Sequence, residues 1–149
     1  MVDLSDLCVL TGMRRGELLE LERGEVAEAG NVWRIEKGLH MGAYLGHSRR
    51  IILGGAAIVV VSRRLKGLRP EQRLFTIRAS AAYTRFCKAC RVAGITGLRT
   101  HELHHEGLSR MADAGLTLGE LQAQSGHRSA QMLMRYMNAK PKDIAAKLG

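Results

Sequence analysis

Four short segments of this sequence carry side chains that could act together on a phosphodiester. They are residues 11–21 (TGMRRGELLEL), 101–107 (HELHHEG), 125–128 (SGHR) and 132–138 (MLMRYMN). Guanidinium groups neutralise phosphate oxygens as charge builds in a transition state, and a phenol oxygen can hold a phosphoryl group covalently. Imidazoles can transfer protons near neutral pH. Because cationic side chains can take the place of a metal ion, these groups predict phosphoryl transfer without a metal or a cofactor.

In this order and at these distances, the four segments resemble the catalytic domain of the tyrosine recombinases, the phage integrase family. The family pattern T-G-x-R-x-x-E-L matches residues 11–18, H-x-x-R falls at 101–104, and a G-H pair falls at 126–127, with its histidine nine residues before Tyr136. The resemblance covers nearly the whole chain. It implies an enzyme of site-specific DNA recombination or integration, which cleaves and rejoins DNA through a phosphotyrosine intermediate.

The resemblance gives each matching residue a role. Arg14 matches the first catalytic arginine, His101 the histidine of H-x-x-R, His127 the later catalytic histidine, and Tyr136 the nucleophile. Glu17 matches the acidic residue that orients the arginine, and it could pair with Arg14. Taken alone, Arg14 could be an ordinary surface charge. A cation at a helix N-terminus is mildly unfavourable, however, which indicates a functional reason for it.

One catalytic position departs from the family pattern. His104 stands where the family carries its second arginine, and a histidine offers one donor instead of a planar fork and is only partly charged at pH 7. Losing a preorganised donor of this kind costs roughly 3–4 kcal/mol. Strand cleavage is therefore expected to be impaired unless another cation compensates, and Arg99 is near in sequence. The neighbouring His105 is expected to be structural.

The lysine that the family places on a β-hairpin is also missing from its expected position. Laying residues 43–53 on the pattern T-K-x-G-x-x-R-x-x-P-L matches Gly46, Arg49 and Leu53, and puts Tyr44 at the lysine position. Lys37 is then the candidate, as the lysine that lies between the two predicted strands. With both departures, the alternative is a catalytically inactive DNA-binding remnant or regulator.

A second alternative comes from the segment His101–His105, which fits the zinc metallopeptidase pattern H-E-x-x-H. On a helix, His101 and His105 would share a face as ligands, with Glu102 as general base. The third ligand would have to come from elsewhere, for example Glu120.

The charge of the chain points to nucleic acid as its partner. The 149 residues include 23 Lys and Arg against 14 Asp and Glu, which gives a net charge of +9. Such a surplus favours phosphate binding, because neutralising phosphates releases counterions. Double-stranded DNA is the expected partner, since 4% aromatic residues leave little for stacking on single strands. The expected DNA contacts are Arg15, Arg49, Arg50, Arg99 and Arg128.

The length predicts one domain over 1–149, a recombinase-like catalytic domain without the family's N-terminal DNA-clamping domain. The segment Asp143–Leu148 could pass to a neighbouring copy and support a homo-oligomer on DNA. No apolar run has the length of a membrane span. The odd number of cysteines and the absence of a secretory signal indicate a reducing cytosol, so a cytoplasmic, nucleoid-associated protein is expected. Of the three cysteines, Cys87 and Cys90 form a C-x-x-C pair without a second pair to complete a zinc site, and they are expected to be buried and unreactive.

Spacing of apolar residues predicts a mainly α fold with a small antiparallel β-sheet (α+β). Helices are expected within 3–22, interrupted at Thr11, which could cap the second of them. Residues 32–35 and 49–53 predict strands, and 56–65 fit either a strand or a helix. Further helices are expected over 80–93, from a cap at Thr100 to Gly115, from a capping box of Thr117 and Glu120, and over 131–136 and 143–148.

Overall fold

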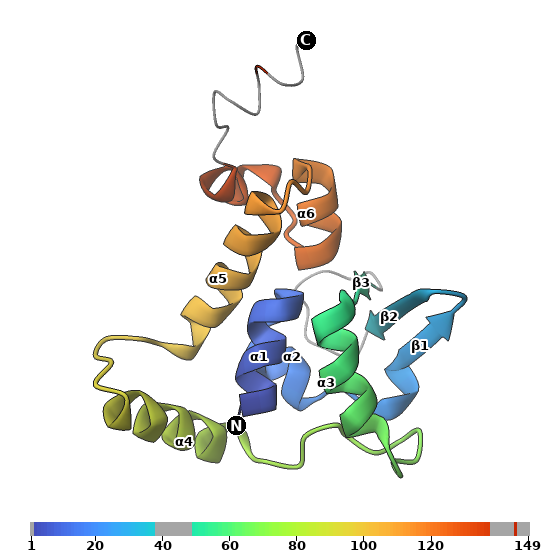
Figure 1. Cartoon of the computed structure of the whole chain (residues 1–149), viewed down its shortest axis with the longest axis vertical. Helices are drawn as coiled ribbons and strands as arrows, with labels where there is room; N and C mark the ends of the chain where they lie inside the picture. The colour runs from blue at the N-terminus through green and yellow to red at the C-terminus, as the bar shows by residue number, and fades with distance from the viewer. Residues whose placement is uncertain (1, 38–48, 138–144, 146–149) are drawn as a thin grey trace.

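The computed structural model describes residues 2–37, 49–137 and residue 145 (Figure 1). The helices are α1 (Val2–Thr11), α2 (Arg15–Leu19), α3 (Gly55–Leu65), α4 (Ala79–Val92), α5 (Thr100–Asp113) and α6 (Leu118–Ser125). Strands β1 (Val26–Ala29), β2 (Val32–Lys37) and β3 (Arg49–Ile52) form one antiparallel sheet in the order β1-β2-β3. Short 3-10 helices are η1 (Arg23–Glu25), η3 (Ala130–Met132) and η4 (Met134–Tyr136). The predicted fold class is confirmed.

The N-terminal half packs α1, α2 and α3 against the sheet around the larger hydrophobic core. The register places Val26 opposite Ile35 and Ile35 opposite Ile51, so three apolar side chains lie in line across the three strands. All three are buried, because side chains alternate between the two faces of a strand. Leu7 of α1 and Val61 of α3 belong to the same cluster. This body holds the turn before α2 and strand β3 in fixed positions.

The C-terminal half is smaller, and α5 joins it to the body. A second apolar cluster contains Leu108, Leu121, Leu133 and Tyr136. Helix α5 packs closely on α1 at Gly107, where an added Cβ would lie only 2.6 Å from the carbonyl oxygen of Val9. Only glycine allows this approach, which brings the histidines of α5 to the end of α1.

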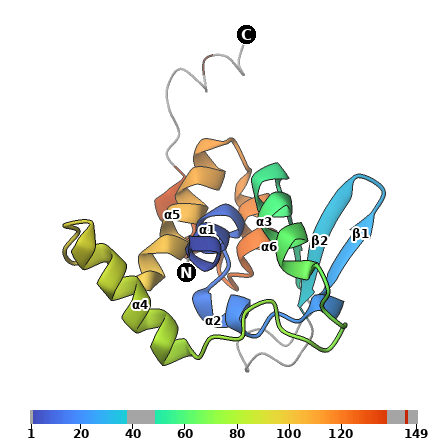
Figure 2. The same cartoon turned by 60° about the horizontal axis from the view of Figure 1, so that its bottom comes forward.

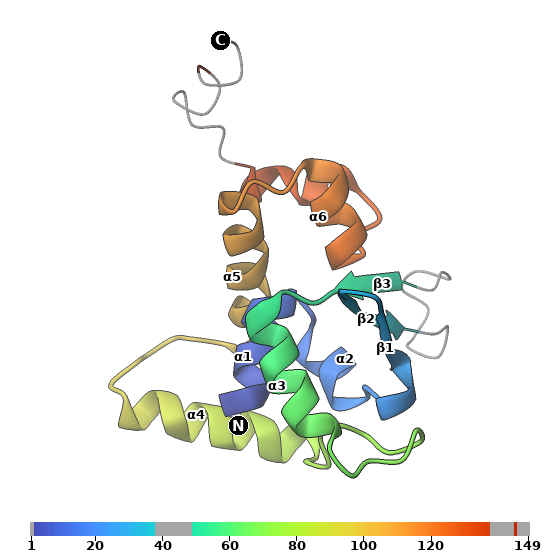
Figure 3. The same cartoon turned by 45° about the vertical axis from the view of Figure 1, so that its right-hand side comes forward.

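A buried glutamine ties α6 to the edge of the sheet. The side chain of Gln124 accepts a hydrogen bond from the N–H of Ile52 at 3.0 Å and donates one to the Ile52 carbonyl at 2.9 Å. The amide thus makes the two hydrogen bonds that a neighbouring strand would make at Ile52, and it covers this part of the free edge of β3. Figure 3 shows α6 standing over β3, with α5 beside it.

The structure confirms some of the predicted helix caps and helix ends and corrects others. The capping box of Thr117 and Glu120 is confirmed, and residues 56–65 are helical. Thr11 does not cap α2: it is the last residue of α1, and its hydroxyl donates to the Leu7 carbonyl at 2.5 Å. The caps of α2 and α5 are Arg14 and Arg99, so the expected cap at Thr100 is wrong by one residue.

Helix α4 is more exposed than its sequence pattern suggests. Only Ala82 and Phe86 are buried, and Figures 1 and 2 show α4 set apart from α5 and α6. The cysteines of α4, Cys87 and Cys90, are half-buried, so the expectation of burial is wrong for both. Cys8 of α1 is buried, and this burial raises the pKa of its thiol to about 12.

Some predictions fall outside the described residues. They concern the side chain of Lys37, the hairpin positions Tyr44 and Gly46, and the segment Asp143–Leu148 apart from residue 145. Within the described ranges, no helix combines the length and the apolar character that crossing a bilayer requires.

Candidate active site

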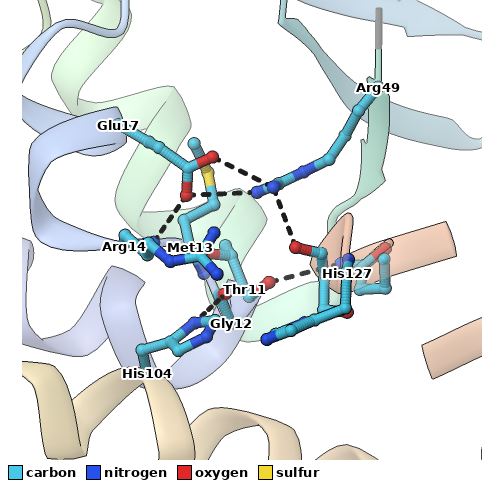
Figure 4. A network of polar contacts seen from close by, with 10 residues as sticks. Thr11, Gly12, Met13, Arg14, Glu17, Arg49, His104 and His127 are labelled. Atoms are coloured by element: carbon cyan, nitrogen blue, oxygen red, sulfur yellow. Dashed lines mark hydrogen bonds and ion pairs between the residues drawn. The ribbon is translucent and has the colours of Figure 1, made fainter. Parts of the chain in front are cut away.

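The turn between α1 and α2 carries the first predicted site residue. Gly12 has a φ of 63°, and a Cβ there would lie 3.1 Å from a methyl group of Leu108, so the turn depends on glycine. The hydroxyl of Thr11 accepts a hydrogen bond from the N–H of Met13 at 3.2 Å. Arg14 follows as the cap of α2, and its side chain lies between Glu17 and His104 in Figure 4.

Glu17 and Arg49 form a nearly buried ion pair beside this turn. The two guanidinium NH groups of Arg49 lie 3.0 Å and 3.2 Å from the Glu17 carboxylate, and one donates to the Ser125 carbonyl at 2.8 Å (Figure 4). The same carboxylate accepts the backbone N–H of Arg14 at 2.7 Å. Glu17 thus positions Arg14 through its backbone and pairs with the guanidinium of Arg49. The Arg49 side chain is 9% exposed and points into the protein.

His104 is buried, with 1% of its surface exposed. Its Nδ1 lies 2.6 Å from the Gly12 carbonyl oxygen, which can only accept, so Nδ1 carries the proton and donates (Figure 4). Burial lowers the pKa of His104 to about 3, and the charge of Arg14 acts in the same direction. The ring is therefore neutral near pH 7, with an unprotonated Nε2. Within the described part of the chain, that Nε2 has no hydrogen-bond partner.

In this state His104 differs from an arginine both in charge and in hydrogen bonding. An arginine at position 104 would present several N–H donors, whereas neutral His104 presents a lone pair at Nε2. A lone pair repels a phosphate oxygen. From the sequence, we predicted that His104 would be a weaker donor to phosphate than an arginine. In the structure, the single N–H of the neutral ring is used by the hydrogen bond to the Gly12 carbonyl, so Nε2 has no proton to donate.

His127 follows α6 in a turn that is closed by Gly126 in the left-handed conformation, with a φ of 69°. Its ring stacks on that of His104, with centroids 5.7 Å apart, and its Nδ1 lies 2.8 Å from the hydroxyl oxygen of Ser125. Burial lowers the pKa of His127, and the charges of Arg14 and Arg49 add to this shift. His127 is thus held beside the arginines from the opposite half of the molecule.

The phenol of Tyr136 lies against His105 of α5, whose ring lies 5.5 Å from that of His104. The Tyr136 hydroxyl is hydrogen-bonded to Nδ1 of His105, and the two rings are stacked with centroids 5.9 Å apart. His101 meets the His105 ring edge-on at 4.4 Å. Tyr136 is 8% exposed, and the guanidinium of Arg135 lies 5.3 Å from the centre of its ring. Sequence reasoning assigned His105 only a structural role, although its spacing from His101 put both rings on one face of α5.

The remaining predicted DNA contacts lie around this centre. Arg15 donates to the Thr100 hydroxyl at 3.2 Å, and its guanidinium lies 5.7 Å from the ring of Tyr83. The side chain of Arg50 is exposed and pairs with Glu36 at 3.3 Å. Arg99 and Arg128 are exposed residues, at the start of α5 and directly after His127 respectively.

Lys37, the candidate for the hairpin lysine, lies at the end of β2. The backbone of Lys37 pairs with Arg49 in the sheet, which puts Lys37 on the strand next to the Glu17–Arg49 ion pair.

In the described ranges, no three His, Cys, Asp or Glu side chains are grouped so that they could hold a metal ion. The metallopeptidase alternative therefore rests on its sequence motif alone.

Comparison with known proteins points to one family. The chain is 34% identical over 162 residues to a protein named as the phiRv2 prophage integrase of Mycobacterium tuberculosis, an alignment that covers 91% of this chain and 42% of that protein. The chain therefore spans less than half the length of this relative.

Solved structures share the fold. The Tn1549 transposon integrase, solved with transposon right-end DNA, superposes with a TM-score of 0.76 at 17% identity over 98% of this chain and 57% of its own. The catalytic domain of bacteriophage HP1 integrase superposes with a TM-score of 0.69 at 21% identity, over 98% of this chain and 79% of its own. A family model described as the phage integrase family matches residues 3–143, and this chain belongs to that family.

Proposed function

We propose that this chain acts in site-specific DNA recombination or integration, by cleaving and rejoining strands through a phosphotyrosine at Tyr136. The observation that carries the proposal is the convergence of Arg14, His104, His127 and the His105–Tyr136 pair around α5 and the turn before α2. In the cleavage step, a bond forms between phosphorus and the Tyr136 oxygen as the bond to the 5′ oxygen breaks. Rejoining reverses both changes.

Each site residue has a proposed part in this step. Arg14 binds the non-bridging phosphate oxygens, and Glu17 with Arg49 holds the turn that presents it. His127 protonates the departing 5′ oxygen, because a phosphate bound beside it would raise the pKa that burial now lowers. Lys37 is the second candidate for that proton. His101 lines the site next to His105.

His104 leads us to propose that cleavage is slow. A neutral ring with a lone pair at Nε2 supplies no donor to the phosphate, and a missing donor costs roughly 3–4 kcal/mol in the transition state. This geometry also favours the second candidate function, a DNA-binding remnant or regulator without cleavage. The two differ only in whether a covalent adduct forms.

Double-stranded DNA is the proposed partner in both cases. The net charge of +9 supplies the long-range attraction, and the exposed Arg50, Arg99 and Arg128 are the proposed phosphate contacts. Arg15 is proposed to contact DNA near the start of α5. Assembly of several copies on DNA, and a place at the cytoplasmic nucleoid, are part of the same proposal.

A suicide substrate tests the function. A pool of nicked duplexes with a randomised centre presupposes no recognition site, and a short cleaved fragment diffuses away and traps the adduct. We expect a covalent protein–DNA product that withstands denaturation and disappears in Tyr136→Phe. Binding to the pool without adduct would favour the inactive module, and an adduct that persists in Tyr136→Phe would contradict the assigned nucleophile.

A further inference from the structure

The Tyr136 hydroxyl is held by an imidazole ring that can act as a base. It is hydrogen-bonded to Nδ1 of His105, which comes from α5, while Tyr136 itself belongs to η4. The stacked rings keep the phenol in one orientation, and the apolar residues Leu108, Leu121 and Leu133 pack around it. A nucleophile within hydrogen-bonding reach of a base is the arrangement on which activated hydroxyl nucleophiles depend.

The direction of this hydrogen bond follows from the chemistry of the two groups. A phenol is a better donor than acceptor, because its oxygen lone pairs are delocalised into the ring. A neutral imidazole offers one nitrogen as acceptor. Burial lowers the pKa of His105, and neighbouring cations act in the same direction, so the ring is neutral near pH 7. The charged or titratable groups that face it are His101, Glu102 and His104 from α5, Arg14 from α2, and Arg135 and Tyr136 from η4.

We propose that His105 is a catalytic residue of this chain, and that it takes the phenolic proton of Tyr136 as the phenol oxygen attacks phosphorus. The inference rests on the proposed function. The proton moves from the Tyr136 oxygen to Nδ1 of His105, the bond from oxygen to phosphorus forms, and the 5′ oxygen leaves with a proton from the general acid. His105 returns its proton to the phenol when the strand is rejoined.

His105→Asn separates this role from a structural one. The Asn side-chain oxygen can lie where Nδ1 lies and accept the same hydrogen bond, but an amide does not take up a proton near neutral pH. A residue that only positions the phenol would thus be replaced well by Asn. A residue that accepts the proton would not.

The phenol can be probed without DNA by an aryl sulfonyl fluoride. In that reaction the phenol oxygen bonds to sulfur, fluoride leaves, and the phenolic proton passes to the base. Benzenesulfonyl fluoride and peptide mapping by mass spectrometry give the labelling rate of Tyr136. Tyr83 on α4 is the internal reference, because it is 48% exposed and belongs to a different element from His105 and Tyr136.

We expect the rate ratio of Tyr136 to Tyr83 to be at least about tenfold higher in the native chain than in His105→Asn. It should fall as the pH is lowered through the titration of His105. An equal ratio in the two proteins, including no labelling of Tyr136 in either, would overturn the inference. If the labelling contrast holds but no DNA adduct forms, the proposed function fails while His105 remains the base for this phenol.

Discussion

The two halves of the molecule supply different kinds of charge to one site. The N-terminal body contributes Arg14, Glu17 and Arg49, and the Arg49 guanidinium is fixed by three contacts to carboxylate and carbonyl oxygens. The C-terminal half contributes imidazoles and a phenol around a much smaller apolar cluster. Arginine stays charged at any working pH, whereas burial and neighbouring cations hold His104 and His127 neutral. The N-terminal half thus contributes a permanent cation at Arg14, whereas the two stacked imidazoles of the C-terminal half are neutral near pH 7.

The largest effect is expected from removing the permanent cation. Arg14→Ala should slow adduct formation by about a hundred- to thousandfold, because one preorganised donor in the transition state is lost, and it should also weaken DNA binding. Single-turnover trapping on the suicide pool measures the rate. Arg14→Lys keeps a charge but loses the planar fork, so its rate should fall between the two. Unchanged binding and rate in Arg14→Ala would remove this residue from the site.

The neutrality of the imidazole half predicts a stability that depends on pH. The folded pKa of His104, about 3, lies below its unfolded value of about 6.5, so the unfolded chain binds the extra proton. The contribution is fully present above about pH 6.5 and is lost as the pH falls toward 3. Between pH 7.5 and pH 5 it should decrease by up to about 2 kcal/mol.

Urea unfolding of His104→Asn gives the matched comparison. Its amide can still donate to the Gly12 carbonyl but does not titrate, so the variant should lose less stability than the native chain over the same pH interval. The lowered pKa values of His105 and His127 are common to both proteins, so the difference between the curves reports on position 104. Parallel stability curves would show that His104 is protonated in the folded state, contrary to the arrangement described here.

The connection between the halves is expected to contribute less. Gln124→Leu leaves the N–H and the carbonyl of Ile52 without their side-chain partner, which should lower the free energy of unfolding by about 1–2 kcal/mol. Gln124→Glu keeps an acceptor for the N–H and tests each bond separately. A Gln124→Leu protein as stable as the native chain would indicate that α5 packing and the Arg49–Ser125 hydrogen bond are enough to hold the halves together.

The smallest effect is expected from the exposed Arg50, one of the proposed phosphate contacts around the site. Arg50→Ala should reduce by about one the slope of the logarithm of DNA affinity against the logarithm of salt concentration, with little change in adduct rate at low salt. Arg69→Ala, on the loop after α3, is the control and should leave the slope unchanged. Fluorescence anisotropy with a labelled duplex measures both. An unaltered slope in Arg50→Ala would place DNA elsewhere on the surface.

The sequence predicted the elements that carry their own local signals. The capping box of Thr117 and Glu120 lies within four residues, and the strand pattern at 49–53 is read from adjacent side chains. The α4 sequence looks amphipathic, but nothing in it reveals that few elements pack against it. Strand β1 was missed, because Val26–Ala29 lacks a strong alternating pattern and depends on pairing with β2.

In the candidate site, motif matching named residues but did not reveal their partners. Glu17 was expected beside the Arg14 side chain, yet its carboxylate binds Arg49, which is 32 residues away in sequence. The tautomer of His104 depends on the Gly12 carbonyl, 92 residues away, and His105 meets a phenol 31 residues away. The His104 contact follows from the crossing of α1 and α5 at Gly107, and the other two join α2 to β3 and α5 to η4; no local pattern encodes these meetings.

The most direct test of this account is to give position 104 the donor that it lacks. With the suicide pool at pH 7.5, His104→Arg should form the Tyr136 adduct on the order of a hundredfold faster than the native chain, because the other groups of the site are already in place. His104→Gln, which adds no cation, should not accelerate it. A folded, DNA-binding His104→Arg protein that forms adduct no faster than the native chain would contradict the claim that the neutral ring of His104 limits an otherwise assembled site.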